Sequence, residues 1–139
     1  MCISYSLNHT FRPGEEIIDF ATEDKSWVTS VTWSKGGKLA FLSKSSVIYI
    51  VDKPLSSEVL PVVLKLQPNT CLSCMTFHDK TLWGVGYNGS ILLVDYKECQ
   101  WRVCDKPSVR GSGSFSRIKS FNFGISITGS HGLLRKVQL

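Results

Sequence analysis

The residues with the clearest capacity for chemistry are Cys71 and Cys74, which form a Cys-x-x-Cys pair. Such a pair can bind zinc or cycle between dithiol and disulfide, but a structural zinc site needs four ligands, usually from a second pair. Cys99 and Cys104 have the wrong spacing and fall in a predicted strand. Residues 71 and 74 are also expected in a strand, where alternation directs them to opposite faces. The sequence therefore predicts no metal site, and we expect the cysteines, Cys2 included, to be small buried apolar residues in a reducing compartment.

The other reactive residue types also lack a catalytic setting. His9, His78 and His131 are isolated, and no Gly-x-Ser-x-Gly or comparable nucleophile motif is present. The glycines of "WGVGYNGS" (83–90) precede an expected strand and no Gly-Lys-Ser/Thr follows, so they do not form a phosphate-binding loop. The sequence assigns no catalytic residue, no cofactor-binding residue, no metal ligand and no cofactor, and it predicts that the protein is not an enzyme.

The four tryptophans alternate with apolar neighbours, which favours packing in a core over ligand stacking: Trp27, Trp33, Trp83 and Trp101.

Composition indicates a single globular domain without a membrane span. The chain has 139 residues, of which 42% are hydrophobic and 19% charged. No apolar run approaches the ~20 residues of a transmembrane helix. The first sixteen residues lack a basic stretch followed by an apolar one, so we expect no signal peptide and a cytoplasmic location, with the nucleus as an alternative.

Charge is distributed unevenly along the chain. Residues 1–24 carry one Arg and five acidic residues, whereas residues 97–139 carry eight Lys or Arg and two acidic residues. A basic segment can attract nucleic acid or an acidic protein surface. Here the basic residues alternate with strand-like apolar ones, which favours a solvated sheet face.

The chain contains three copies of one pattern at a period of 43 residues. Each copy has an alternating stretch (27–33, 70–77 and 114–121) followed by a hairpin, and the first two copies continue into another such stretch (57–66 and 98–104). The hairpin is clearest at Asn88-Gly89, where Asn-Gly favours a tight primed turn. The equivalent positions are Ser43, Gly86 and Gly129; Ser46, Gly89 and Gly132; Asp52, Asp95 and Gln138; Leu39, Leu82 and Ile125; and Val51, Val94 and Val137.

A period of ~40–45 residues with four strands per unit is typical of β-propeller blades. The predicted fold is therefore all-β, a partial WD-repeat β-propeller of about three four-stranded antiparallel blades. The blades are expected at about 26–68, 69–112 and 113–139. Residues 1–25 are expected to form a lead-in strand and a short helix or loop, the latter within 13–24.

Residues 26–52, "SWVTSVTWSKGGKLAFLSKSSVIYIVD", resemble one WD-repeat family, subunit 1 of the actin-related protein 2/3 complex. Residues 82–96 are similar to the sixth-blade segment of that family, and residues 127–139 share the outline of its last blade. The resemblance covers the carboxy-terminal half of a seven-blade protein, with the shorter residues 99–117 in place of a long family insertion. The residues of 26–52 that match are Trp27, Val28, Val31, Trp33, Ser34, Gly37, Leu39, Ala40 and Phe41.

The resemblance implies a non-catalytic scaffold that supports actin filament nucleation and branching. Its implied partners are the other subunits of the actin-related protein 2/3 complex, actin filaments and nucleation-promoting factors, in the actin-rich cell cortex. Two alternatives are a WD-repeat adaptor of another assembly and a binder of nucleic acid or an acidic partner through the basic segment. Because three blades do not close a ring, we also expect two uncovered apolar faces, and self-association or dependence on a partner.

Overall fold

The described part of the chain is built from β-strands and contains no helix. The structure is a computed structural model. It describes residues 2–6, 17–23, 25–52, 60–67, 70–87, 89–105, 114–130 and 134–138.

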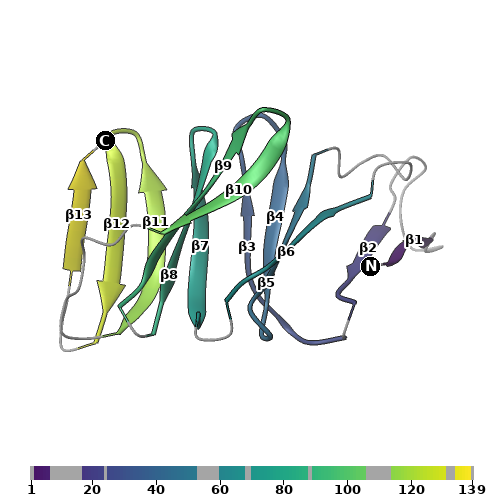
Figure 1. Cartoon of the computed structure of the whole chain (residues 1–139), viewed down its shortest axis with the longest axis horizontal. Coiled ribbons are helices and arrows are strands. Elements are labelled where there is room, and N and C mark those ends of the chain that lie inside the picture. The colour runs from purple at the N-terminus through teal and green to yellow at the C-terminus, as the bar shows by residue number, and fades with distance from the viewer. Residues whose placement is uncertain are drawn as a thin grey trace.

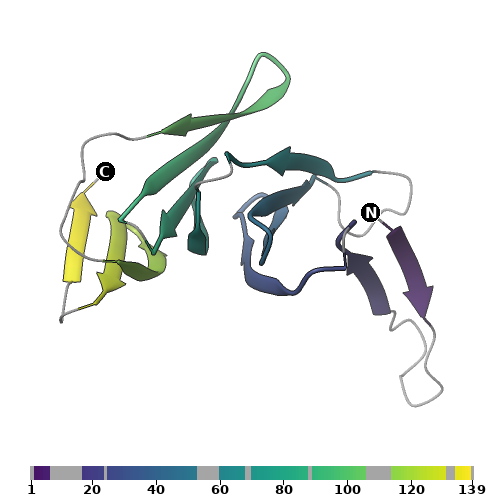
Figure 2. The same cartoon turned by 60° about the horizontal axis from the view of Figure 1, so that its bottom comes forward.

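Three antiparallel sheets of four, four and three strands follow one another along the chain. Figure 1 shows them side by side in chain order along the long axis, with β13 at one end and β1 and β2 at the other, and Figure 2 shows the same sequence of sheets from a second direction. In each sheet, strands that pair are neighbours in the sequence, so the sheets are successive blades of a partial β-propeller.

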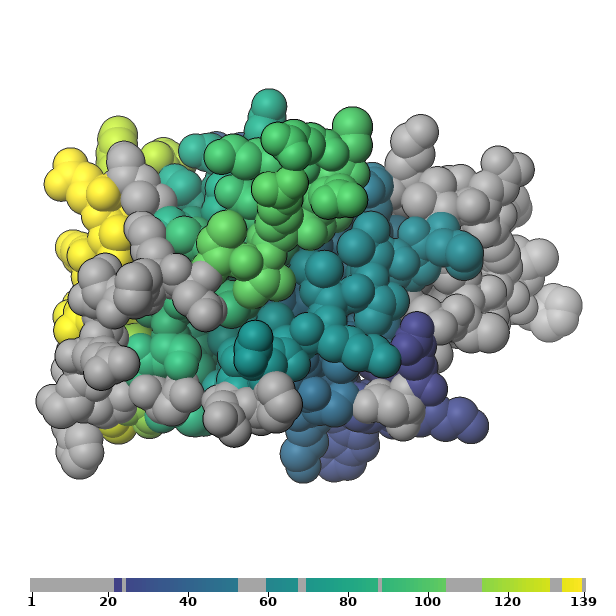
Figure 3. Space-filling model, viewed as in Figure 1, coloured from purple at the N-terminus to yellow at the C-terminus, as the bar shows by residue number. Residues whose placement is uncertain are grey.

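The first sheet has the order β3 (Val28–Trp33), β4 (Leu39–Ser43), β5 (Val47–Val51) and β6 (Val62–Lys65). The second sheet comprises β7 (Leu72–His78), β8 (Thr81–Gly86), β9 (Ile91–Lys97) and β10 (Gln100–Asp105). The last sheet comprises β11 (Phe115–Phe121), β12 (Gly124–Gly129) and β13 (Leu134–Gln138). In space-filling view, β6 and the β9–β10 hairpin form the middle of the face toward the viewer (Figure 3).

The strand register confirms the 43-residue repeat. Leu39 pairs with Val51, Leu82 with Val94, and Ile125 with Val137, so the same two positions of the repeat face each other in every sheet. All but Val137 of these side chains are buried. The apolar positions that define the repeat in the sequence are thus the ones that build the core.

A β-bulge at the start of β3, β7 and β11 is also repeated. The irregularity falls between Val28 and Ser30, between Leu72 and Cys74, and between Phe115 and Arg117. Just before each bulge, a backbone hydrogen bond joins the residue preceding the first strand to the residue following the second strand. The N–H of Lys44 donates to Trp27 O (2.7 Å), that of Tyr87 to Cys71 O (3.0 Å) and that of Ser130 to Ser114 O (2.9 Å). The bulged residue carries a hydroxyl that donates to the partner strand: Thr29 to Leu42 O, Ser73 to Val85 O and Ser116 to Thr128 O.

Apolar side chains fill the space between successive sheets. One cluster joins the first and second sheets, and includes Leu42, Ile50, Phe77 and Trp101. A second cluster joins the second and last sheets, and includes Trp83, Val85, Phe115 and Ile127.

Hydrogen bonds between β3 and β7 also join the first and second sheets. The backbone N–H of Met75 donates to Ser30 Oγ (3.0 Å), and that of Phe77 donates to Thr32 Oγ1 (3.1 Å). Two hydroxyl side chains of β3 therefore fix β7 beside it.

The expectation of a short helix or loop within 13–24 is wrong for residues 17–21. These residues form strand β2 (Ile17–Ala21), which pairs with β1 (Cys2–Ser6). Ile17, Ile18 and Phe20 are β-branched or aromatic and favour an extended backbone, which outweighs the weak helix signal of the preceding acidic residues. The rest of the 13–24 segment lies largely outside the described residues.

The Asn-Gly hairpin exists, but its loop is longer than the two-residue primed turn that the sequence favours. Gly86 N–H bonds to Ser90 O (3.0 Å) and Gly89 N–H bonds to Gly86 O (3.1 Å), which leaves residues 87–89 as the loop. Gly89 has a φ of 78°, as expected for the last position of a three-residue loop with a bulge. Ser46, one period earlier, has a φ of 62° in the equivalent turn. Asn88 and the expected turn at 131–132 lie outside the described residues.

The expectation of two uncovered apolar faces is wrong for the last sheet. Its face away from the second sheet is mainly polar: Arg117, Lys119 and Lys136 are exposed there beside Ser126 and Thr128, and Phe121 and Leu134 are the exposed apolar side chains of this face. This confirms the solvated basic face predicted from the charge pattern.

The face of the first sheet that points away from the second sheet is apolar. Leu39, Phe41 and Tyr49 are buried on it, whereas Val31 and Trp33 on β3 remain 56% and 57% exposed. The two ends of the arc therefore differ in chemistry.

Candidate interaction site between the first two sheets

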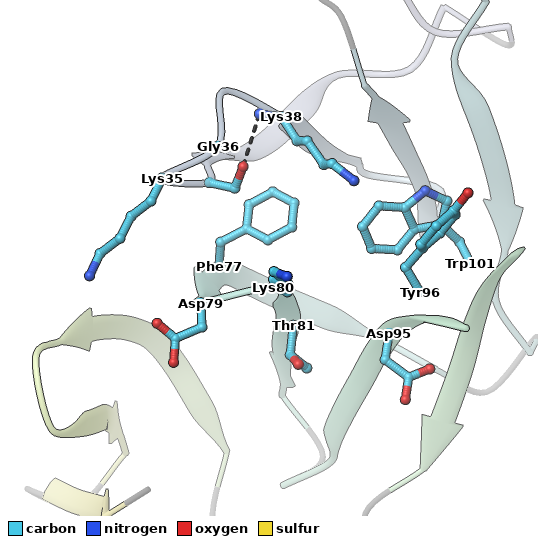
Figure 4. Close-up of a pocket in the computed structure, with 11 residues that line it drawn as sticks. Lys35, Gly36, Lys38, Phe77, Asp79, Lys80, Thr81, Asp95, Tyr96 and Trp101 are labelled. Atoms are coloured by element: carbon cyan, nitrogen blue, oxygen red, sulfur yellow. Dashed lines mark hydrogen bonds between the residues drawn. The ribbon is translucent and has the colours of Figure 1, made fainter. Parts of the chain in front are cut away.

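A hollow of about 820 Å³ lies between the first and second sheets (Figure 4). Its walls are the 34–38 turn of the first sheet, and the β7–β8 turn and β9–β10 hairpin of the second. A volume of this size lies within the ~300–1,000 Å³ of ordinary ligand pockets.

An aromatic pair forms one wall of this hollow. Tyr96 and Trp101 face each other across β9 and β10, so the register places their side chains on the same face. Their ring centroids are 5.2 Å apart and the planes are tilted by 54°. The buried Trp101 Nε1 has no hydrogen-bond partner among the described residues.

The ammonium of Lys38 lies over both rings. Lys38 Nζ is 5.1 Å from the Tyr96 ring centroid, 5.0 Å from that of Trp101 and 3.3 Å from Asp52 Oδ1. Attraction between a cation and the negative face of an aromatic ring is favourable at these distances. The two rings and the carboxylate therefore form a seat for an ammonium group.

Local structure in the first sheet places Lys38 there. The backbone N–H of Lys38 donates to Ser34 Oγ (2.9 Å), and that of Ser34 donates to Lys38 O (2.8 Å). Gly37 adopts a φ of 87° and allows the tight turn. Lys38 thus directly precedes β4, with its side chain directed across the sheet interface.

Desolvation, followed by the neighbouring Cys99 and then Asp52, raises the pKa of the Tyr96 phenol above its ordinary value. The phenol therefore stays neutral at physiological pH. A neutral ring next to the Lys38 ammonium interacts through its π face rather than as an anion.

The cysteines singled out in the sequence do not come together as a site. Cys71, Cys99 and Cys104 are exposed and Cys74 is half-buried, so the expectation of buried cysteines is wrong for these three. Cys71 precedes β7, Cys99 lies in a turn and Cys104 lies on the edge strand β10, and all three places face solvent. Within the described residues no group of three or more His, Cys, Asp and Glu side chains could hold a metal ion.

The histidines and tryptophans are dispersed. His78 Nδ1 lies 2.9 Å from Ser120 Oγ, which links the second sheet to the last, while His9 and His131 lie outside the described residues. Trp83 and Trp101 are buried as predicted. The prediction of core packing is wrong for Trp27, which precedes β3, and for Trp33, whose face of β3 no described strand covers; both are exposed.

A second hollow, of about 650 Å³, follows the first strands of the three sheets. It is lined mainly by polar side chains, including Ser30, Thr76, Arg117 and Lys119. Arg117 and Lys119, which lie on the basic face of the last sheet, therefore also line this second hollow.

Sequence reasoning did not find the aromatic seat. The signal that the sequence did contain was the carboxylate repeated one period apart at Asp52 and Asp95. The first of these two carboxylates forms the ion pair with Lys38. What was missing was the position of Lys38, 58 residues before Tyr96 in the chain, which only the packing of two sheets brings near the rings.

No protein-family model matches the chain, and no curated protein matches its sequence. Within the described residues, no helix is long and apolar enough to cross a membrane.

Proposed function

We propose that this chain is a non-catalytic scaffold that binds other proteins through the surfaces of a partial β-propeller. The observation that carries the proposal is the apolar patch on β3, where Val28, Val31 and Trp33 are exposed. Their register partners Ser43, Phe41 and Leu39 alternate along β4, so the three side chains lie on one face. Exposed apolar side chains gathered on one face are typical of protein interaction sites.

The resemblance of residues 26–52 to subunit 1 of the actin-related protein 2/3 complex suggests which proteins this scaffold binds. On this proposal the chain contacts other subunits of that complex and supports actin filament nucleation and branching. The matching residues Val31 and Trp33 belong to the exposed patch, which is where a contact with a neighbouring subunit is most readily made.

Co-purification tests this function. The tagged chain is isolated from its own cells, and recovery of actin-related proteins is measured for the wild type, for Trp33→Ser and for Phe123→Ser. Phe123 is an exposed aromatic residue of the last sheet, in the turn after β11, and serves as the matched control. We expect Trp33→Ser alone to lower recovery several-fold. Recovery of a different assembly would support an adaptor of that assembly, and equal recovery with both variants would contradict the role of the patch.

The basic face of the last sheet favours a second candidate, binding to nucleic acid or another polyanion. Arg117, Lys119 and Lys136 lie on one face with no acidic residue among the described residues of that sheet. Binding to a short DNA duplex and to heparin should weaken as salt increases, because phosphate contacts release counterions. Changing the three residues to Gln should reduce the slope of log affinity against log salt by about three. Binding that is independent of salt would exclude this candidate.

A further inference from the structure

The seat around Lys38 has the composition of a cation-recognition site. Two aromatic faces and one carboxylate converge on a single ammonium, and this ammonium comes from a different sheet than the rings. Recognition of an ammonium group by such a set of groups is a recurring use of cation–π attraction.

Two hollows border the aromatic pair. The 820 Å³ hollow and a smaller one of about 300 Å³, which is also lined by Asp52, Val62 and Gln100, both have Tyr96 and Trp101 in their walls. The Lys38 side chain is 37% exposed. An external group can therefore enter without separating the sheets.

We propose that Tyr96, Trp101 and Asp52 form a recognition site for a lysine side chain of a partner protein, and that Lys38 is its internal occupant. Aromatic faces and a carboxylate attract a cation and repel an anion, which selects the class of ligand. Figure 4 shows Lys35 extending away from the rings, while Asp79 and Lys80, which also line the hollow, carry opposite charges. The inference is separate from the scaffold proposal, since it requires no particular assembly.

Lys38 and an incoming lysine compete for the same seat. A tethered group acts at an effective concentration of about millimolar or more, so the wild type binds a free lysine weakly. Removal of the Lys38 ammonium should open the site. Acetylation of Lys38 would have the same effect, because it removes the charge.

The test is a titration with Nα-acetyl-lysine amide, followed by the NMR signal of the Trp101 indole N–H. The neutral probe Nα-acetyl-norleucine amide controls for apolar binding. Lys38→Met retains an unbranched stem and removes the ammonium, and Lys35→Met makes the same change at a lysine directed away from the rings. We expect Lys38→Met to bind the lysine probe at least about tenfold more tightly than the wild type or Lys35→Met, with no gain for the norleucine probe.

Equal binding of the lysine probe by Lys38→Met and Lys35→Met would overturn the proposal, as would equal binding of the two probes. If Lys38→Met fails to fold, the wild type and Tyr96→Leu at high probe concentration decide the question. Tyr96 is 48% exposed, so its substitution disturbs the core little. A lysine-specific shift of the Trp101 signal that Tyr96→Leu abolishes supports the site, and its absence from the wild type rejects it.

Discussion

The first and last sheets are copies of one pattern, yet one of their two faces differs. This is the face of the first sheet that packs against the second sheet, and the equivalent face of the last sheet, which points away from the second sheet. On the first sheet, this face carries Ala40, Leu42, Ile48 and Ile50, all fully buried against the second sheet. Two periods later, the equivalent positions on the last sheet are Ser126, Thr128, Leu134 and Lys136. The backbone pattern is therefore independent of whether a further sheet packs against it. Side-chain polarity alone distinguishes an interface from a solvated surface, as in the outer faces of terminal repeats.

The largest expected effect comes from removing an interface side chain. Leu42→Ala deletes a fully buried side chain between two sheets and should lower the free energy of unfolding by about 2–5 kcal/mol. Thr128→Ala, at the equivalent but exposed position, should change it by less than about 0.5 kcal/mol. Urea unfolding measures both, and similar losses would show that the last sheet also has an interface on this face.

The first and last sheets also differ at the end of their second strand, which is Ser43 in the first sheet and Gly129 in the last. A Cβ on Gly129 would lie 2.2 Å from Ser114 O, so Gly129→Ala should cost about 2–3 kcal/mol. Ser43, two periods earlier, accommodates a side chain, and its Oγ accepts a hydrogen bond from Val47 N (3.2 Å). Ser43→Gly should therefore cost only about 1 kcal/mol. A harmless Gly129→Ala in thermal unfolding would mean that the bulge does not bring Ser114 this close.

The turn between the second and third strands of the first two sheets provides the next comparison. Gly89→Val places a β-branched residue at a φ of 78° and should cost about 1–3 kcal/mol. Ser46→Gly, at the equivalent left-handed position, should stabilise the first sheet by up to about 1 kcal/mol. Opposite signs in chemical denaturation are the expected result. The same sign for both substitutions would contradict the equivalence of the two turns.

The smallest effect concerns the bulge hydroxyls. Ser73 Oγ lies 3.0 Å from Val85 O and 2.7 Å from Phe115 O, and so connects two sheets, whereas the exposed Ser116 Oγ reaches only Thr128 O at 3.2 Å. Ser73→Ala should cost about 1 kcal/mol and Ser116→Ala less than about 0.5 kcal/mol. Equal midpoints in urea would show that the contact between the sheets adds nothing.

The repeat made most of the fold predictable from the sequence. Leu39, Leu82 and Ile125 reveal their common role because the period is constant and because their neighbours alternate. The same alignment also shows Leu42, Val85 and Thr128 at one position, so the polar face of the last sheet can be read from it.

Turn geometry was less predictable, because Asn-Gly is a signal of composition and not of loop length. A two-residue turn with positive φ at both positions does occur, but at Glu98 and Cys99, with φ values of 52° and 61°. Neither residue type indicates such a turn. The pairing of Lys97 with Gln100 on either side imposes it, with support from an ion pair between Arg102 and Glu98 (2.8 Å).

The candidate site was the least predictable part. Tyr96 and Trp101 can be paired from a hairpin prediction, but the cation that they hold belongs to the preceding sheet. Local sequence patterns do not encode which turn of one sheet reaches which hairpin of the next. That information lies in the relative rotation of the sheets, which the apolar interface sets.

Pairing only between strands that are neighbours in the chain affects the kinetics of folding. Apart from the ten residues between β5 and β6, the connections within the three large sheets have at most five residues, so the entropy of loop closure is small at most steps. A sheet can therefore form soon after its own residues leave the ribosome, before the later sheets are synthesised. The bonds of Ser30 and Thr32 to β7 then join the second unit to the first, in the order in which the chain is made.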